Sequence, residues 1–379
     1  MTAKSEIPSK DYARQYRAIW PEIQAAIERA FFHDDPILGD AVARFEANLA
    51  RYHGTATAVG VASGMAALEL TLRELGVGPG DEVITGAHTF VGTVTAIVLA
   101  GATPVLVDAD PATGLIDVEG VPRAITPRTR ALLPVHFYGH PVDLTRLQEI
   151  AAGARVHLVE DGAQAHGAKW QGQSIGGFGV ACALSFHPSK NLGAFGDGGA
   201  ILTDDLAFAE RLRVVRNLGK GSKYEFSRVA GNNKLDTLQA AILDVKLRHL
   251  DAWIERRRQL AALYRAGLAG VGDLVLPHEH PDARHAFHLY VVRTSRRDAL
   301  QRHLASHGVR AGLHYPIAAH RHAAHAERFR GQSFPVAERF AGEVLTLPLS
   351  HEHEDAEIAR VIDVVRGFYR AAATVERAS

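Results

Sequence analysis

The chain has 379 residues, enough for two domains, and 47% of them are apolar, so it can bury a sizeable core. The 42 Lys and Arg residues balance 42 Asp and Glu residues, which gives no electrostatic basis for binding nucleic acid or an anionic membrane. A single cysteine, Cys182, excludes an internal disulfide. Without a signal-peptide pattern or an apolar run of membrane length, we expect a cytoplasmic protein.

Short apolar runs alternate with helical patterns through the first two thirds of the chain. Helices are expected at residues 64–75 and 91–99. The predicted strands are apolar runs at residues 57–61, 82–85, 104–107, 131–135, 156–159 and 181–186. Such strands, separated by crossover helices, are typical of a mostly parallel sheet covered on both faces. Because ligands bind at the carboxyl ends of the strands in these sheets, the residues after each strand are candidates for a functional site.

The pattern then changes to one long helical stretch, expected over residues 235–268. The elements predicted after it are two strands and two helices, at residues 287–294, 309–313, 297–306 and 355–369. We therefore predict an α/β protein with a large domain over residues 1–245 and a smaller C-terminal α/β domain over residues 246–379.

The first polar segment is a small turn from a strand into a helix, at Ser63, Gly64 and Met65. A helix that begins this way has free backbone N–H groups and a positive dipole end, which together make a phosphate site. A simple N-cap by Ser63 explains the same residues. This segment alone does not decide between the two interpretations.

The second segment brings two acids, an amide and an imidazole to the sheet edge: Glu160, Asp161, Gln164 and His166. An unpaired carboxylate is expensive to bury, so Asp161 needs a cationic partner or a metal. A protonated pyridine nitrogen is such a partner. A structural ion pair or a helix cap would also satisfy Asp161.

The third segment is a loop that places Lys190 between Pro188 and Gly193, just after a predicted strand. Its neighbours are small or apolar, and desolvation lowers the pKa of a lysine and makes the neutral amine available for a Schiff base. Ser185, near the end of the same strand, is placed to reach a phosphate. The glycine-rich residues 196–199 lack the G-x-G-x-x-G spacing and are interpreted as a tight turn into a strand.

Together the segments supply a phosphate cup, an acid for a ring nitrogen and an amine for an aldehyde. Pyridoxal phosphate (PLP) requires this set of groups. Asp161 and Lys190 are far enough apart in sequence for a strand to lie between them. They therefore belong to separate strand ends and can face each other across a ring.

The same segments resemble those of the DegT/DnrJ/EryC1/StrS family of sugar aminotransferases, which are fold-type I PLP enzymes. The resemblance extends from about Leu38 to Leu347. Its most specific pieces are EDGAQAHG at residues 160–167 and SFHPSKNLG at residues 185–193. Supporting pieces lie at residues 78–83, 134–139, 234–241 and 314–316.

By this resemblance, Lys190 binds the cofactor covalently and moves a proton, and Asp161 pairs with the pyridinium nitrogen. Gln164 contacts the ring hydroxyl, and Phe90 stacks on the ring face. The residues implied to hold the phosphate are Ser63, Gly64, Met65 and Ser185. Met65 replaces a threonine that is usual in the family, so backbone N–H groups would take the place of its hydroxyl.

The resemblance also implies a homodimer with active sites at the interface, because Asn232 matches an asparagine that reaches the phosphate of the neighbouring subunit. The residues implied to bind the sugar are His166, His314 and Tyr315. The implied substrates are L-glutamate, as amino donor, and a nucleotide-linked keto-sugar. The run from Lys190 to Gly199 is more similar to members that act at C3 of the sugar. This favours a dTDP-3-keto-6-deoxyhexose over the alternative, a C4-acting aminotransferase.

Three other functions compete with this one. Family members that are dehydratases or lyases replace the lysine with histidine, and Lys190 argues against them. A regulator that binds PLP or another ligand without catalysis is the second, and the intact Lys190 and Asp161 argue against it. The third is a metalloenzyme, but the dense histidine clusters have no known metal-ligand spacing, at residues 278–280, 320–325 and 351–353.

Overall fold

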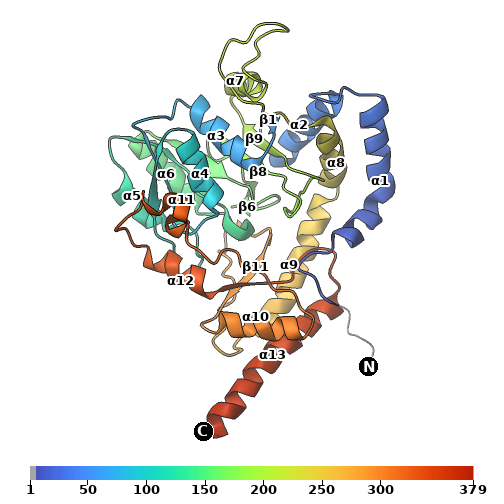
Figure 1. Cartoon of the computed structure of the whole chain (residues 1–379), viewed down its shortest axis with the longest axis vertical. Helices are drawn as coiled ribbons and strands as arrows, with labels where there is room; N and C mark the ends of the chain where they lie inside the picture. The colour runs from blue at the N-terminus through green and yellow to red at the C-terminus, as the bar shows by residue number, and fades with distance from the viewer. Residues whose placement is uncertain (1–5, 379) are drawn as a thin grey trace.

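A seven-stranded sheet forms the centre of the N-terminal two thirds of the chain (Figure 1). The computed structural model describes residues 6–378. The strand order is β1-β9-β8-β5-β4-β2-β3, and β9 runs opposite to the other six strands. The expected mostly parallel sheet is therefore confirmed. The strands are Thr57–Val61 (β1), Glu82–Gly86 (β2), Thr103–Val107 (β3), Thr129–Leu132 (β4), His157–Asp161 (β5), Ala181–Ser185 (β8) and Gly199–Thr203 (β9).

Two apolar cores lie on the two faces of this sheet, one beneath α3, α4 and α7 and the other beneath α2, α6 and α8. Val159 and Ala183 belong to the first core, whereas Leu158 and Leu184 belong to the second. Because successive side chains of a strand point to opposite faces, a continuously apolar strand fills both cores. The helices are Tyr12–Phe32 (α1), Asp40–His53 (α2), Gly64–Glu74 (α3), Val91–Leu99 (α4), Val121–Ala124 (α5), Leu144–Ala154 (α6), Leu206–Arg216 (α7) and Thr237–Leu247 (α8).

The rest of the chain forms smaller sheets and helices around a third core. The antiparallel pair β11 and β12 packs there with α9, α10 and α13, and Ile7 from the N-terminal segment joins them. The division at residue 245 stays a prediction. Among residues 6–378, no helix combines the length and the apolar character needed to cross a membrane. The elements are Lys169–Trp170 (β6), Gln173–Ser174 (β7), Leu250–Leu268 (α9), Ala283–Arg284 (β10), Tyr290–Arg293 (β11), Arg297–Ser306 (α10), Ala323–Ala326 (α11), Pro335–Glu343 (α12), Val344–Leu347 (β12) and Asp355–Ala378 (α13).

The long helix expected over residues 235–268 is wrong, because the structure has two helices there. The backbone N–H groups of Arg248 and His249 bond to carbonyls three residues earlier, which tightens the end of α8 and separates it from α9. The strand expected at residues 309–313 is also absent from the described chain, where Val309 and Gly312 make only isolated bridges.

Two further strands are shorter than expected. The strand β4 ends at Leu132, before Pro134, which has no backbone N–H group for a ladder. The strand β11 begins at Tyr290 rather than at residue 287, because Phe287 has a φ of +43°, outside the strand region.

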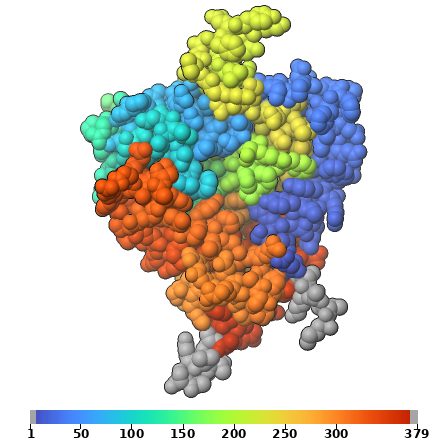
Figure 2. All heavy atoms as spheres, in the orientation of Figure 1, coloured from blue at the N-terminus to red at the C-terminus, as the bar shows by residue number. Residues whose placement is uncertain are grey.

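Residues 218–230, called the arm below, project from the body of the molecule between α7 and α8 (Figures 1 and 2). Large apolar side chains are exposed on it, with Tyr224 85% and Val229 98% exposed. A protein in water rarely leaves several such side chains uncovered, so the arm is a candidate contact surface.

A buried carboxylate, Glu160, ties β5 to the segment before β8. Its two oxygens accept backbone N–H groups from Gly176 at 2.9 Å, Phe178 at 3.1 Å and Gly179 at 3.0 Å, and lie 3.1 Å from Nε2 of His136. Burial acts to raise the pKa of Glu160, but these partners outweigh it and hold the pKa below the usual value. The charged form is therefore the one that the fold stabilises.

We predict that Glu160→Gln lowers the free energy of unfolding at pH 7 by about 3 kcal/mol, because an amide hydrogen then faces groups that need an acceptor. The contribution of Glu160 is present above its unfolded-state pKa and is lost as the pH falls through its lower folded-state pKa. The difference between the two proteins should therefore narrow in acid. Urea unfolding at several pH values measures it. Glu149→Gln, on the surface of α6, is the control, and an equal loss there would refute the assignment.

Candidate active site

A cavity of about 530 Å³ opens at the carboxyl ends of the sheet strands. Its volume is in the usual range of ligand sites, about 300–1,000 Å³. The walls come from the ends of β5 and β8, the beginnings of α3 and α4, and one residue of the C-terminal part, Tyr315. The predicted site residues that line it are Ser63, Gly64, Met65, Phe90, Asp161, Gln164, Ser185, Lys190 and Tyr315.

Asp161 is the last residue of β5 and is 3% exposed. One carboxylate oxygen accepts the hydroxyl of Thr93 at 2.8 Å, and the other accepts the backbone N–H of Ala163 at 3.1 Å. Burial raises the pKa of Asp161, against the opposing effect of these hydrogen bonds and of Lys190. A cationic ligand beside Asp161 would offset the cost of burying its charge.

Lys190 faces the same cavity from the loop after β8. Burial lowers the pKa of its amine to about 8, and Asp161 partly opposes the shift. Near neutral pH the neutral amine is thus much more abundant than in a solvated lysine. The loop is held by its own backbone, since the N–H of Lys190 donates to the carbonyl of His187 at 2.8 Å.

Two lysines from distant parts of the chain support this loop, the half-buried Lys10 and the buried Lys246. Nζ of Lys10 donates to the carbonyl of Ser189, and Nζ of Lys246 donates to the carbonyl of Gly193. Sequence reasoning missed both contacts, as it missed the hydroxyl of Thr93 on Asp161. The hydrogen bond of Lys10 spans 179 residues, and no local pattern indicates such a contact.

The N-terminus of α3 lines the same cavity as Lys190. Ser63 is its N-cap and accepts the backbone N–H of Ala66 at 3.1 Å, so its hydroxyl is already engaged. A Cβ atom on Gly64 would lie 2.6 Å from Cβ of Ser185, so only glycine lets the helix start so close to β8. This close approach leaves free N–H groups and the Ser185 hydroxyl in one corner, which fits a phosphate.

Gln164, Tyr315 and Phe90 form one side of the cavity. Oε1 of Gln164 accepts the backbone N–H of Tyr138 at 2.8 Å, and its Nε2 lies 3.5 Å from the hydroxyl of Tyr315. The rings of Tyr315 and Phe90 are 5.3 Å apart, and Phe90 is 47% exposed. An aromatic face and an amide donor are therefore available to a planar ligand.

Three predicted residues lie outside the cavity lining. His166 is fully buried against the ring of Phe186, and the expectation that it binds the substrate stays a prediction. His314 lies next to Tyr315, with Nδ1 2.8 Å from the hydroxyl of Thr346. Asn232 is exposed at the base of the arm, bridged to Asn217.

These features fit PLP. The buried Asp161 carboxylate has hydrogen-bond donors, but within residues 6–378 no cation forms an ion pair with it. The corner at Gly64 and Ser185 would be filled by any added Cβ. Lys190 would carry the cofactor, Asp161 would hold its ring nitrogen, and the α3 N-terminus would hold its phosphate. Among residues 6–378, no three His, Cys, Asp or Glu side chains are grouped as for a metal ion.

We predict that Gly64→Ala weakens PLP binding by the apoprotein at least about tenfold, because a lost hydrogen bond to a charged group costs about 1.5–3 kcal/mol. Gly153→Ala in α6 is the matched control, since its Cβ would meet nothing within 4 Å and should leave the affinity unchanged. A PLP titration followed by absorbance measures both. Equal affinity of the Gly64 variant and the unaltered protein would contradict the phosphate assignment.

Comparison with known proteins shows which family the chain is similar to. The model of the DegT/DnrJ/EryC1/StrS aminotransferase family matches residues 18–366. The dTDP-3-amino-3,4,6-trideoxy-alpha-D-glucose transaminase of Streptomyces venezuelae is 46% identical over 370 residues, covering 97% of this chain and 98% of the relative. The erythromycin biosynthesis sensory transduction protein EryC1 of Saccharopolyspora erythraea is 47% identical over 359 residues, covering 93% and 98%.

A solved structure is similar to this chain in both fold and sequence. The S. venezuelae protein DesV, in complex with a ketimine intermediate, superposes with a TM-score of 0.95 at 46% identity, over 97% of this chain and 99% of that chain. The shared fold and the family match over most of the chain lead to one conclusion. The chain belongs to the DegT/DnrJ/EryC1/StrS aminotransferase family.

Proposed function

We propose that this protein is a PLP-dependent aminotransferase that transfers the amino group of L-glutamate to C3 of a dTDP-linked 3-keto-6-deoxyhexose. The observation that carries the proposal is the pair Asp161 and Lys190, which line one cavity from the ends of neighbouring parallel strands. The relative named a dTDP-3-amino-3,4,6-trideoxy-alpha-D-glucose transaminase, 46% identical over 97% of the chain, supports the sugar and the position of the amine.

The residues of the chain have separate tasks in this reaction. When bound, PLP supplies an electron sink that allows a proton to leave a substrate carbon. Asp161 keeps a proton on the ring nitrogen, since its buried carboxylate is stabilised by a cation. Lys190, neutral in a buried site, accepts and returns a proton at Nζ. Phe90 and Tyr315, whose rings lie 5.3 Å apart in the cavity wall, would cover one side of the cofactor ring and exclude water from it.

A regulatory role is the main rival, because the relative EryC1 has the name of a sensory transduction protein. A ligand-binding regulator needs neither a desolvated lysine amine nor a buried acid facing it. Burying either charged group costs free energy, and a reaction that uses both groups accounts for that cost. The buried pair therefore favours catalysis.

The direct test is incubation with L-glutamate and either the 3-keto or the 4-keto dTDP-6-deoxyhexose, with mass spectrometry of the sugar. We expect amination of the 3-keto sugar and release of 2-oxoglutarate. Asp161→Asn, which removes the charge and keeps the shape, should lower kcat at least about a hundredfold. Amination of the 4-keto sugar alone would support the C4 alternative. With neither sugar aminated, the regulator would be the better account.

The proposed enzyme is a homodimer in which the arm reaches the partner subunit. The exposed apolar side chains of the arm support this, and they are Leu218, Tyr224, Phe226 and Val229. Asn232 at its base is exposed and lies outside the cavity of its own subunit. Such a side chain is free to complete the phosphate site of a second copy.

Mixing two inactive variants tests the shared site. Lys190→Ala and Asn232→Asp each damage both sites of their own homodimer, the second by placing a negative charge beside the phosphate. A mixed dimer contains one site with both residues intact, so we predict that mixing restores transaminase activity after subunit exchange. Unrestored activity, with exchange verified by mass, would place Asn232 outside the partner's site. The control is Lys190→Ala with Lys190→Arg, which cannot complement each other.

A further inference from the structure

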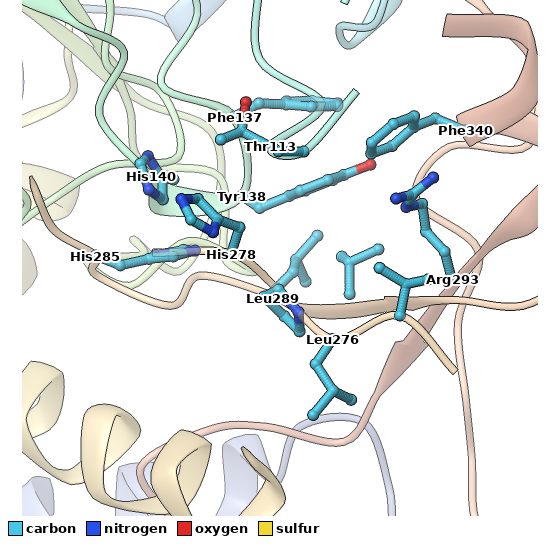
Figure 3. Close-up of a pocket in the computed structure, with 14 residues that line it drawn as sticks. Thr113, Phe137, Tyr138, His140, Leu276, His278, His285, Leu289, Arg293 and Phe340 are labelled. Atoms are coloured by element: carbon cyan, nitrogen blue, oxygen red, sulfur yellow. The ribbon is translucent and has the colours of Figure 1, made fainter. Parts of the chain in front are cut away.

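Tyr138 lies where the sheet meets the C-terminal part of the chain. It is the middle residue of a short 3-10 turn, Phe137–Gly139, after β4, and its φ of +59° is uncommon for a residue with a side chain. Its ring stacks on Phe137 with centroids 4.1 Å apart. Figure 3 shows the ring of Tyr138 extending from Phe137 toward Phe340, with the hydroxyl at the far end.

The two ends of Tyr138 bond to a residue of the cavity wall, Gln164, and to the residue next to another wall residue, Tyr315. The backbone N–H donates to Oε1 of Gln164 at 2.8 Å, so the amide of Gln164 is oriented with its Nε2 toward the hydroxyl of Tyr315, 3.5 Å away. The hydroxyl donates to the carbonyl of His314, the residue before Tyr315. Tyr138 thus forms hydrogen bonds to two segments that are far apart in the sequence, one containing Gln164 and the other containing Tyr315.

The hydroxyl is itself fixed by a second contact. Nε2 of His88 lies 3.2 Å from it, and Nδ1 of His88 lies 2.8 Å from the carbonyl of Gly114. Nδ1 must donate to that carbonyl, so Nε2 is an acceptor, because burial lowers the pKa of His88 to about 4 and keeps the ring neutral. The hydroxyl hydrogen therefore stays in the small region between two acceptors.

We propose that Tyr138 is a positioning residue, which sets how Gln164 and Tyr315 lie beside each other on one side of the cavity. It holds Gln164 through its N–H and the segment of His314 and Tyr315 through its hydroxyl. The consequence for transamination rests on the proposed function. The geometric part does not, and it is tested on the apoprotein.

Tyr138→Phe distinguishes the contact of the hydroxyl from the contact of the backbone N–H. It keeps the ring on Phe137 and the N–H on Gln164, and it removes the hydroxyl's bond to His314 together with its contact to His88. We expect faster hydrogen–deuterium exchange at residues 311–317 of the apoprotein and unchanged PLP affinity. With the keto-sugar that the unaltered enzyme aminates, kcat/KM should fall about tenfold, as expected for one lost buried hydrogen bond.

A double-mutant cycle shows whether the effect passes through Tyr315. In a Tyr315→Ala background, Tyr138→Phe should have little further effect on kcat/KM, because the group that it positions is gone. A full tenfold loss in that background would overturn the proposal. So would unchanged exchange at residues 311–317 in the single variant.

Tyr264→Phe is the matched control. The buried hydroxyl of Tyr264 donates to the carbonyl of Pro348 at 2.8 Å, within the third core and away from the cavity lining. It should lower the melting temperature without changing exchange at residues 311–317 or kcat/KM. An equal fall in kcat/KM would show that loss of stability alone explains the result and would overturn the proposal. An inactive unaltered enzyme would instead refute the proposed function, and the exchange experiment would still decide the role of Tyr138.

Discussion

The burial of an acid and an amine at one sheet edge is the constraint on which the rest of this structure depends. Asp161 ends β5, and Lys190 follows β8, the parallel neighbour of β5. Adjacent parallel strands end at the same edge, so two residues distant in sequence face one cavity. Without a ligand, burial disfavours the charged form of both groups, since it raises the pKa of Asp161 and lowers that of Lys190 to about 8. Such a site suits a ligand with a cationic ring beside Asp161 and an aldehyde beside Lys190.

Much of the surrounding structure serves to keep this edge rigid. Glu160, next to Asp161, is held by three backbone N–H groups and fixes the segment before β8. Lys10 and Lys246 support the Lys190 loop from two other directions. Precise placement matters because catalytic groups lose efficiency when their geometry loosens by about an ångström. The reactive pair is thus built on the sheet, and distant segments provide the support.

The local part of this design could be predicted from the sequence, and the long-range part could not. Continuous apolar runs indicated the strands, and the polar residues just after them indicated Asp161, Gln164 and Lys190. The burial of His166 was not foreseen, because its position in a motif says nothing about which way its ring points. The hydroxyl of Tyr138 and Nζ of Lys10 each bond to a backbone carbonyl far along the chain, and every residue has such a carbonyl, so the sequence does not indicate these contacts. The break between α8 and α9 was missed because one apolar stripe continues across it.

The most direct test of the account is the absorption spectrum of the purified protein with PLP, recorded before and after L-glutamate, beside Lys190→Ala and the control Lys169→Ala. The account predicts a band of lysine-bound cofactor in the unaltered protein and in Lys169→Ala, which glutamate bleaches toward the absorption of the pyridoxamine form. Lys190→Ala should lack that band. A lysine-bound band that persists in Lys190→Ala, or no such band in the unaltered protein with saturating PLP, would contradict the assignment of Lys190 and Asp161 as the reactive pair.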